Sequence, residues 1–381
     1  MKVIAFYLPQ FHAIEENDKW WGKGYTEWTH LKKAVPLYEG HNQPRIPLNK
    51  NYYNLLDDRV KEWQCSLANK YGVYGFCFYH YWFNGHLLLE KPLEQFLQNK
   101  KCNTHFMICW ANENWTNAWV SDKSETLIAQ KYGDRNEWKQ HFDYFLPFFK
   151  DKRYIIEDRK PILVIYRPEI IKDLNKMLDY WEELAIENGF EGIKYAYQNI
   201  NFDRIENRDD SRFDYAIESQ PSYGVRELEE KSKVNKLLKN TKKRIDVITE
   251  KTFGKKINTH KVVGLKQYDY DDIWEAILSR IPTSEKYIPG AFVDWDNTPR
   301  WGKSGSSFIG VDTEKFQMYF SRLIKKAKKD YKKDMIFIFA WNEWSEGGYL
   351  EPDEKNKYGF LEAILSALEE SGELPEKMGD I

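Results

Sequence analysis

Short apolar runs alternate with amphipathic stretches along almost the whole of this 381-residue chain. The runs have the length and the aromatic and β-branched content of buried strands. Several are apolar on both faces, as parallel strands covered by helices are. They lie at residues 3–8, 75–82, 105–111, 161–166, 193–200, 214–219, 287–295 and 335–341. Eight strands that alternate with helices predict an α/β fold, a (β/α)8 TIM barrel with long loops at its C-terminal face.

The main alternative to this barrel is an open, doubly wound sheet. Nucleotide-binding sheets of that kind carry a glycine-rich turn after the first strand, whereas here the sequence continues with YLPQFH (7–12). The barrel is therefore the preferred prediction, as a single domain over residues 1–381.

Two long segments interrupt the alternation. Residues 9–52 are too long for a plain strand-to-helix loop, so we expect them to form a lid or one wall of a site. Residues 225–270 are predicted to be an insertion on the barrel. Their strongly basic part, 231–261, is interpreted as a solvated helix rather than as a patch for an anionic polymer or phosphate.

Charge and cysteine content narrow the class of protein. A formal net charge of −2 gives no electrostatic argument for nucleic acid or a membrane as partner. No apolar run reaches the ~20 residues that span a bilayer, and the opening MKVIAFYLPQFH shows no signal peptide. The four cysteines show no CxxC spacing, so we expect a reduced, cytoplasmic protein.

Polar and aromatic side chains gather where the predicted strands end, and in a (β/α)8 barrel these C-terminal ends carry the active site. The chain is rich in aromatic residues, with 15 Trp, 25 Tyr and 22 Phe. Carboxylates and amides suit sugar hydroxyls, and aromatic rings stack on the apolar faces of sugars. We therefore predict a sugar-binding cleft lined by His12, Trp28, His80, Trp82, Glu113, Trp115, Tyr166, Gln198, Trp295, Trp341 and Trp344.

The segment FIFAWNEWSEGGYLEPD (337–353) carries two carboxylates, Glu343 and Glu346, between indoles. Glycosidic cleavage usually uses two carboxyl groups about 5–9.5 Å apart, and three residues of extended chain span at most ~10 Å. Neighbouring indoles raise the pKa of a carboxyl by desolvation, as an acid catalyst requires. We therefore predict that the two glutamates are a catalytic pair, rather than exposed acids of a capping loop.

Five motifs resemble the WbsX-like family of polysaccharide-locus proteins, and they cover nearly the whole chain: YLPQFH, WWGKGYTEW, YHYWFNG, WANENWT and WNEWSEGGYLEP. That family is similar to glycoside hydrolase family 99, the endo-α-mannosidase and endo-mannanase group. The resemblance implies a (β/α)8 barrel and a retaining mechanism without a protein nucleophile. Glu343 would be the base on the sugar 2-hydroxyl, closing a 1,2-anhydro ring, and Glu346 would be the general acid and base. Ser345 stands where family 99 commonly has His, which leaves the sugar and the linkage open.

Other functions remain open at this point. WbsX-like proteins are often labelled glycosyltransferases, and Asp294-Trp295-Asp296 is a D-x-D arrangement that could hold a divalent metal under a sugar diphosphate. A non-catalytic carbohydrate-binding protein would need only the aromatic residues. The eight His are scattered without an H-E-x-x-H spacing, so we predict no metal and no cofactor. The predicted partner is an oligo- or polysaccharide, and the oligomeric state is left open.

Overall fold

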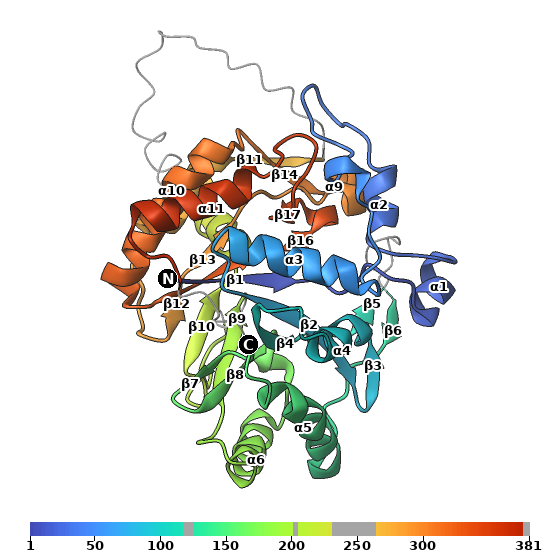
Figure 1. Cartoon of the computed structure of the whole chain (residues 1–381), viewed down its shortest axis with the longest axis vertical. Coiled ribbons are helices and arrows are strands. Elements are labelled where there is room, and N and C mark those ends of the chain that lie inside the picture. Colours follow the sequence, from blue (N-terminus) through green and yellow to red (C-terminus); the bar gives the residue numbers. More distant parts are fainter. Residues whose placement is uncertain (117–124, 201–204, 231–263, 376–381) are drawn as a thin grey trace, which may run out of the picture.

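A nearly closed ring of parallel strands forms the centre of the computed structural model, which describes residues 1–116, 125–200, 205–230 and 264–375 (Figure 1). In hydrogen-bonded order these strands are β12 (Tyr287–Ile288), β10 (Tyr215–Glu218), β9 (Lys194–Asn199), β8 (Lys160–Ile165), β4 (His105–Trp110), β2 (Gly75–Phe83), β1 (Lys2–Tyr7), β15 (Met335–Phe339) and β13 (Gly290–Phe292). Their side chains are almost all buried. The eight predicted strand positions are confirmed, and with them the α/β barrel.

The seventh strand closes the ring in two pieces, because Pro289 separates β12 from β13. Proline has no N–H to donate to a ladder, so it interrupts the pairing. Its carbonyl still accepts a hydrogen bond from the backbone of Phe337, at 3.2 Å. β12 pairs with β10 and β13 with β15, all in parallel. A Cβ at Gly290 would lie 1.8 Å from the carbonyl oxygen of Glu218, so only glycine lets the backbones approach here.

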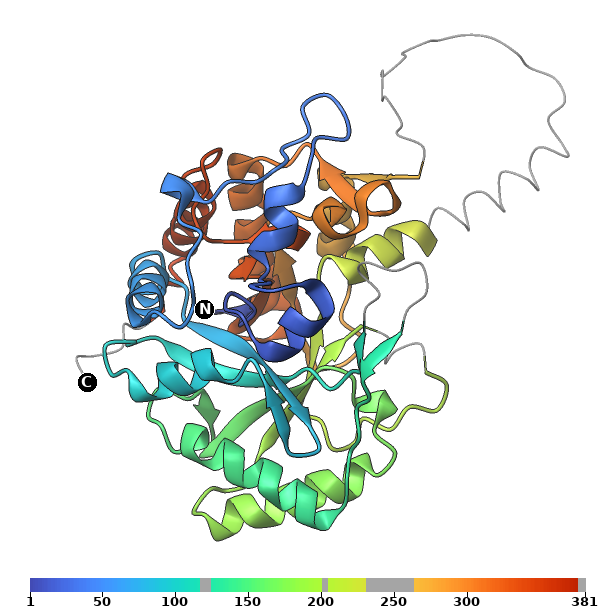
Figure 2. The ribbon, with the colours of Figure 1, turned by 90° about the vertical axis from the view of Figure 1, so that its right-hand side faces the viewer.

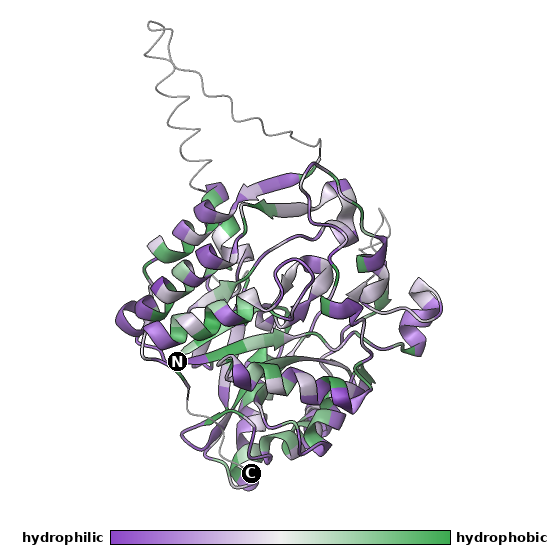
Figure 3. Cartoon of the chain, turned by 45° about the horizontal axis from the view of Figure 1, so that its top comes forward, coloured by the Kyte–Doolittle hydropathy of each residue, from purple (hydrophilic) through white to green (hydrophobic). Residues whose placement is uncertain are grey.

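Helices cover the outside of the barrel: α3 (Asp58–Lys70), α4 (Lys91–Gln98), α5 (Arg135–Phe149), α6 (Leu174–Glu187), α8 (Tyr270–Ser279), α10 (Thr313–Lys326) and α11 (Gly359–Glu370). Their apolar faces pack on the strands and their hydrophilic faces point outward (Figure 3). Aspartates at positions 57, 134, 269 and 312 cap four of them by accepting backbone N–H groups. None of the helices in the described ranges is both long and apolar enough to cross a membrane.

The alternation departs from the prediction in one place. Between β9 and β10, the described residues 200 and 205–214 form no helix. Residues 222–230 are helical, whereas 231–263 lie outside the described residues. The basic segment 231–261, and with it most of the predicted insertion, therefore receives no structural description.

Long connections at the C-terminal ends of the strands surround the barrel mouth. The connection from β1 to α3 contains α1 (Glu15–Trp21) and α2 (Trp28–Lys33), which lie in front of the strands in Figure 2. The short elements of the other connections are β3 (His86–Leu88), β5 (Trp115–Thr116), β6 (Thr126–Ile128), α9 (Thr298–Trp301), β11 (Lys266–Asp269), β14 (Ser306–Ile309), β16 (Asn342–Glu343) and β17 (Gly348–Tyr349). β7 (Ile156–Glu157) forms a hairpin with β8 at its opposite end.

Candidate active site

A cleft of about 340 Å³ opens at the C-terminal ends of the strands. Its walls come from β2 and from the C-terminal ends of β1, β4, β8, β13 and β15 with their connections, as the barrel predicts. The lining residues are Leu8, Gln10, Trp21, Tyr25, Glu27, Tyr79, Tyr81, Ala111, Glu113, Asn114, Trp115, Thr116, Tyr166, Arg300, Trp301, Phe339, Glu343 and Glu346. Four of them, from Gln10 to Glu27, belong to the segment 9–52, which therefore forms part of the wall.

Three carboxylates converge on one guanidinium in this cleft. Nη1 of Arg300 lies 2.5 Å from Oε1 of Glu346, and Nη2 lies 2.6 Å from Oε1 of Glu27. The same Nη2 is 3.6 Å from Oε2 of Glu343, an ion-pair distance without a hydrogen bond. Within the described residues, Oε2 of Glu343 is buried and has no hydrogen-bond partner. Buried polar atoms are normally hydrogen-bonded, so this unpaired oxygen marks Glu343 as a candidate functional residue.

Burial shifts the protonation of this cluster. Desolvation raises the pKa of Glu343 well above its usual value, the charge of Glu346 raises it further, and Arg300 opposes both effects. Desolvation likewise raises the pKa of Glu346, again against Arg300. A coupled pair of this kind holds one proton over a range of pH in which isolated glutamates are ionised. Perturbed, interacting carboxyls in a cleft are typical of acid–base sites.

The two glutamates face the cleft because the residues between and beside them make hydrogen bonds to other segments of the chain. The side-chain amide of Asn342 makes two hydrogen bonds to the backbone of Leu8, of 2.8 and 3.0 Å. The hydroxyl of Ser345 donates to the carbonyl of Glu27, at 3.2 Å. Gly347 then turns the chain with φ of +71°, and a Cβ there would lie 2.7 Å from the backbone nitrogen of Asp296.

Five of the residues predicted to line the site come together in this cleft, namely Glu113, Trp115, Tyr166, Glu343 and Glu346. Glu113 forms an ion pair with Arg167 at the rim. The Trp115 ring packs edge-on against Tyr81, with centroids 5.0 Å apart.

The remaining predicted residues do not line this cleft. Nε2 of His80 lies 3.0 Å from Nε2 of His141 inside the barrel wall, and the Trp82 ring stacks on the same His141 ring at 4.4 Å. Nδ1 of His12 contacts the carbonyl of Pro9 at 3.2 Å, and the Trp28 indole donates to the carbonyl of Tyr53.

Gln198 lies one layer behind the cleft and donates to the hydroxyl of Tyr79, at 3.2 Å. Trp295 lines a neighbouring pocket, where its indole donates to Ser306 at 2.8 Å. Trp341 and Trp344 are fully buried beneath the cleft. Those of these residues that lie at a strand end were not placed by the sequence, because alternate residues of a strand point to opposite sides and the linear pattern does not say which side a residue takes. Trp28 instead begins helix α2.

Sequence reasoning missed Glu27, Arg300, Tyr25 and Tyr79 as cleft residues. Glu27 and Tyr25 belong to the WWGKGYTEW motif and Tyr79 to YHYWFNG, so membership in these motifs could have identified them as site residues. Arg300 stands in NTPRWG, after the seventh strand, without a pattern that marks it. Its role follows only from the contacts it makes with residues far away in the chain.

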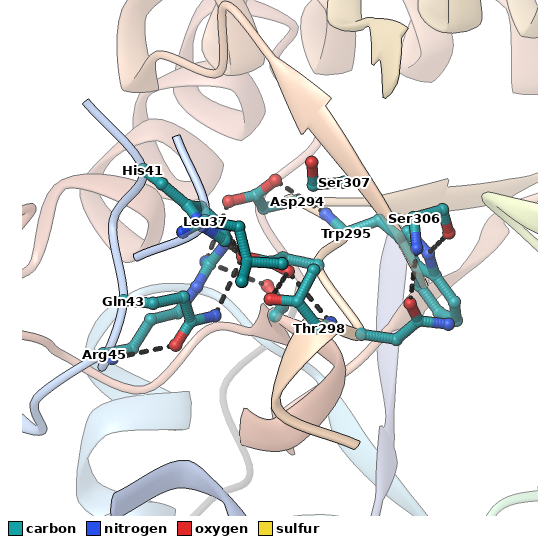
Figure 4. Close-up of polar contacts among 12 residues, drawn as sticks. Leu37, His41, Gln43, Arg45, Asp294, Trp295, Thr298, Ser306 and Ser307 are labelled. Carbon is teal, nitrogen blue, oxygen red and sulfur yellow. Dashed lines mark hydrogen bonds and ion pairs between the residues drawn. The ribbon is translucent and has the colours of Figure 1, made fainter. Parts of the chain in front are cut away.

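The D-x-D arrangement is an internal ion-pair cluster (Figure 4). Nη1 of Arg45 lies 2.8 Å from Oδ2 of Asp294, and Nη2 lies 3.6 Å from Oδ2 of Asp296. Oδ2 of Asp296 also contacts Nε2 of His41 at 2.7 Å and accepts from Gln43 at 2.8 Å. Both carboxylates are buried and already paired, so they do not fit a divalent metal under a sugar diphosphate.

The imidazole of His41 is a neutral donor in this cluster. Its Nδ1 accepts a hydrogen bond from the backbone N–H of Leu37 at 3.0 Å, so the proton must be on Nε2, which donates to Asp296. Throughout the described part of the chain, no group of three or more His, Cys, Asp or Glu side chains is arranged to hold a metal ion.

Comparisons with known proteins place this chain in a family. The family described as "Glycosyltransferase WbsX" matches residues 3–364. Two curated relatives from Xanthomonas campestris pv. campestris, both called "Uncharacterized protein WxcX", are 31% and 32% identical over 368 residues. The match covers 96% of this chain and 49% of each relative, so the chain spans about half the length of these relatives.

Solved structures show the same fold at low sequence identity. The family 99 endo-α-mannosidase from Bacteroides thetaiotaomicron has a TM-score of 0.55 at 12% identity, covering 98% of both chains. The structure of this enzyme in complex with bis-tris propane has a TM-score of 0.54 at 13% sequence identity, and the match covers 97% of both chains. A glycoside hydrolase-like protein has a TM-score of 0.54 at 12% sequence identity, and the match covers 96% of this chain and 93% of the other. The chain thus belongs to the family described as glycosyltransferase WbsX, a family of carbohydrate-active enzymes, and it folds like the endo-α-mannosidases of family 99.

Proposed function

We propose that this protein is a retaining glycoside hydrolase that acts on a bacterial poly- or oligosaccharide through a 1,2-anhydro sugar. The observation that carries the proposal is the cluster of Glu343 and Glu346 around Arg300 at the bottom of the cleft. A carbohydrate-active family and the barrel shared with family 99 support it. The aromatic walls, including Trp21, Trp115 and Trp301, suit the apolar faces of sugar rings.

In the proposed reaction, Glu343 removes the proton of the sugar 2-hydroxyl while that oxygen attacks the anomeric carbon. Glu346 protonates the leaving oxygen, so the glycosidic bond breaks as the three-membered ring closes. Glu346 then removes a proton from water, which opens the ring at the anomeric carbon, and Glu343 returns its proton to the 2-oxygen. Two inversions at the same carbon give net retention, and each glutamate ends as it began.

This reaction requires one proton on the pair, with Glu343 ionised and Glu346 protonated. For the protein alone, burial raises the pKa of both carboxyls, so the pair retains one shared proton. A sugar hydroxyl that donates a hydrogen bond to Glu343 stabilises its ionised form, which leaves the proton to Glu346. Substrate binding and correct protonation are thereby coupled.

The test is a digestion screen of bacterial polysaccharides with product analysis. We expect new reducing ends, and proton NMR of the first product should show the anomeric configuration of the substrate. A 1,2-anhydro sugar matching the released unit should itself be hydrolysed. A first product of inverted configuration would exclude the proposed mechanism.

The family description favours a second candidate, transfer from a sugar donor. In its usual metal-dependent form, that reaction would use the D-x-D carboxylates, which here are paired with Arg45. Calorimetric titration with nucleotide sugars and Mn²⁺ separates the two functions, because a hydrolase should show no Mn²⁺-dependent binding of a nucleotide sugar.

A further inference from the structure

A fourth carboxylate, Glu351, lies buried under the catalytic segment and saturates its two oxygens with neutral donors. Oε1 accepts from the Gln64 amide at 2.7 Å and from the Trp341 indole at 3.1 Å. Oε2 accepts from the Tyr53 hydroxyl at 2.8 Å and from the Trp344 indole at 2.7 Å. A carboxylate has about four acceptor positions, so Glu351 has none left for a ligand.

The two indoles that bind Glu351 flank the catalytic pair's first member in the sequence. Trp341 precedes Asn342-Glu343 in the sequence and Trp344 follows it. By binding both indoles, the Glu351 carboxylate therefore fixes the chain on both sides of Glu343. The backbone of Glu343 is also held by its antiparallel pairing with Gly348, between β16 and β17. The indoles interleaved with the acids in WNEWSE therefore point away from the cleft and toward Glu351.

We propose that Glu351 is a positioning residue for Glu343: it fixes the two flanking indoles and so aims the base at the sugar 2-hydroxyl. This inference rests on the proposed function, because the base role of Glu343 belongs to it. A carboxylate suits the task because no neutral side chain offers four acceptor positions at one point. Desolvation raises the pKa of Glu351 to about 7, and the four donors work against that rise.

Glu346 does not depend on Glu351 in the same way. Its side chain is held by Arg300, and its carbonyl accepts from the backbone N–H of Asp296 at 2.7 Å. Disturbing Glu351 should therefore impair the step that needs Glu343 more than the protonation of the leaving group.

Glu351→Gln tests the proposal, because an amide has one acceptor oxygen and its NH2 would face indole N–H groups. We expect kcat to fall by about 10²-fold, as a displacement of about 1 Å can cause, with KM close to the wild-type value. The loss should be equal for the natural glycan and for an activated aryl glycoside of the same sugar, because either leaving group departs only as the 2-oxygen attacks the anomeric carbon. An unchanged kcat, a change in KM alone, or a loss confined to the natural glycan would overturn the proposal.

Glu354→Gln is the matched control, since Glu354 lies three residues further along and binds Lys357 and the backbone of Asn49 near the surface. It should leave both kinetic constants unchanged. Trp344→Phe removes one of the four donors without removing the carboxylate. It should show a smaller loss of kcat, again independent of the leaving group, and it serves as the test if Glu351→Gln does not fold.

Hydrogen–deuterium exchange of the peptide covering residues 340–351 tests the positioning without any substrate. Exchange should be faster in Glu351→Gln than in wild type and unchanged in Glu354→Gln. Equal exchange in all three proteins would overturn the proposal. If wild type cleaves no glycan but exchange behaves as expected, the proposed hydrolysis fails while the anchoring by Glu351 stands.

Discussion

Arg300 holds Glu346 in an ion pair of 2.5 Å, although the two residues come from connections after different strands, β13 and β15. The two strands are neighbours in the barrel, so their C-terminal connections meet at the mouth. The guanidinium keeps Glu346 in one place while limiting the rise of its pKa. The pair is thus both a geometric and an electrostatic element of the candidate site.

Glu346→Gln should abolish cleavage of ordinary glycosides, because an amide neither protonates the leaving oxygen nor deprotonates water. General acid–base assistance contributes about 10²–10⁴-fold, so kcat/KM should fall by that order. An activated aryl glycoside needs the proton much less, and activity on it should be retained better. Initial rates on both substrates check this, and an equal loss on the two would contradict the assignment.

Glu343→Gln should lose activity on natural and activated substrates alike, since the anhydro ring cannot close without the base. Mass spectrometry should detect no glycosyl ester on Glu343 in the Glu346→Gln variant and none on Glu346 in the Glu343→Gln variant. A trapped sugar ester on Glu343 would replace this mechanism with two-carboxylate retention through a covalent intermediate.

Arg300→Met should move the pH–activity profile to higher pH. Arg300 lowers the pKa of both glutamates, so its removal raises both. The acidic limb of the pH–activity profile reports ionisation of the base, and the alkaline limb reports loss of the proton from the acid. Both limbs therefore move to higher pH. The profile of kcat/KM from pH 4 to 9 measures this. Lys303→Met, which removes an exposed cation three residues away, should leave the profile in place.

Asp296→Asn should lower the free energy of unfolding, and Mn²⁺ should not affect the stability of the wild-type protein. It removes a buried charge that His41, Gln43 and Arg45 all contact, and breaking a buried ion pair of this kind costs about 3–5 kcal/mol. Urea unfolding measures the loss, with the exposed Asp272→Asn as control. Millimolar Mn²⁺ should not change the unfolding midpoint of wild type; stabilisation that disappears in Asp296→Asn would restore the metal-site interpretation.

The sequence by itself determined the barrel and the segment that carries the candidate catalytic pair. Buried parallel strands must be apolar on both faces, so runs such as 105–111 and 335–341 are visible without any tertiary information. Glu343 and Glu346 were predicted because carboxylates that follow such a strand lie at the mouth of a barrel. The same reasoning brought Glu113, Trp115 and Tyr166 to the cleft.

Only the tertiary structure decided which side chains face the cleft and what holds them. The short turn over Trp344–Glu346 and the positive φ of Gly347 break the alternation of the strand, so Trp341 and Trp344 turn to Glu351 rather than to the cleft. Arg300 meets Glu27 across 273 residues, and no local periodicity encodes such a contact. Burial and charge pairing arise between elements that are distant in the chain, and for that reason they become visible only once the barrel has brought those elements together.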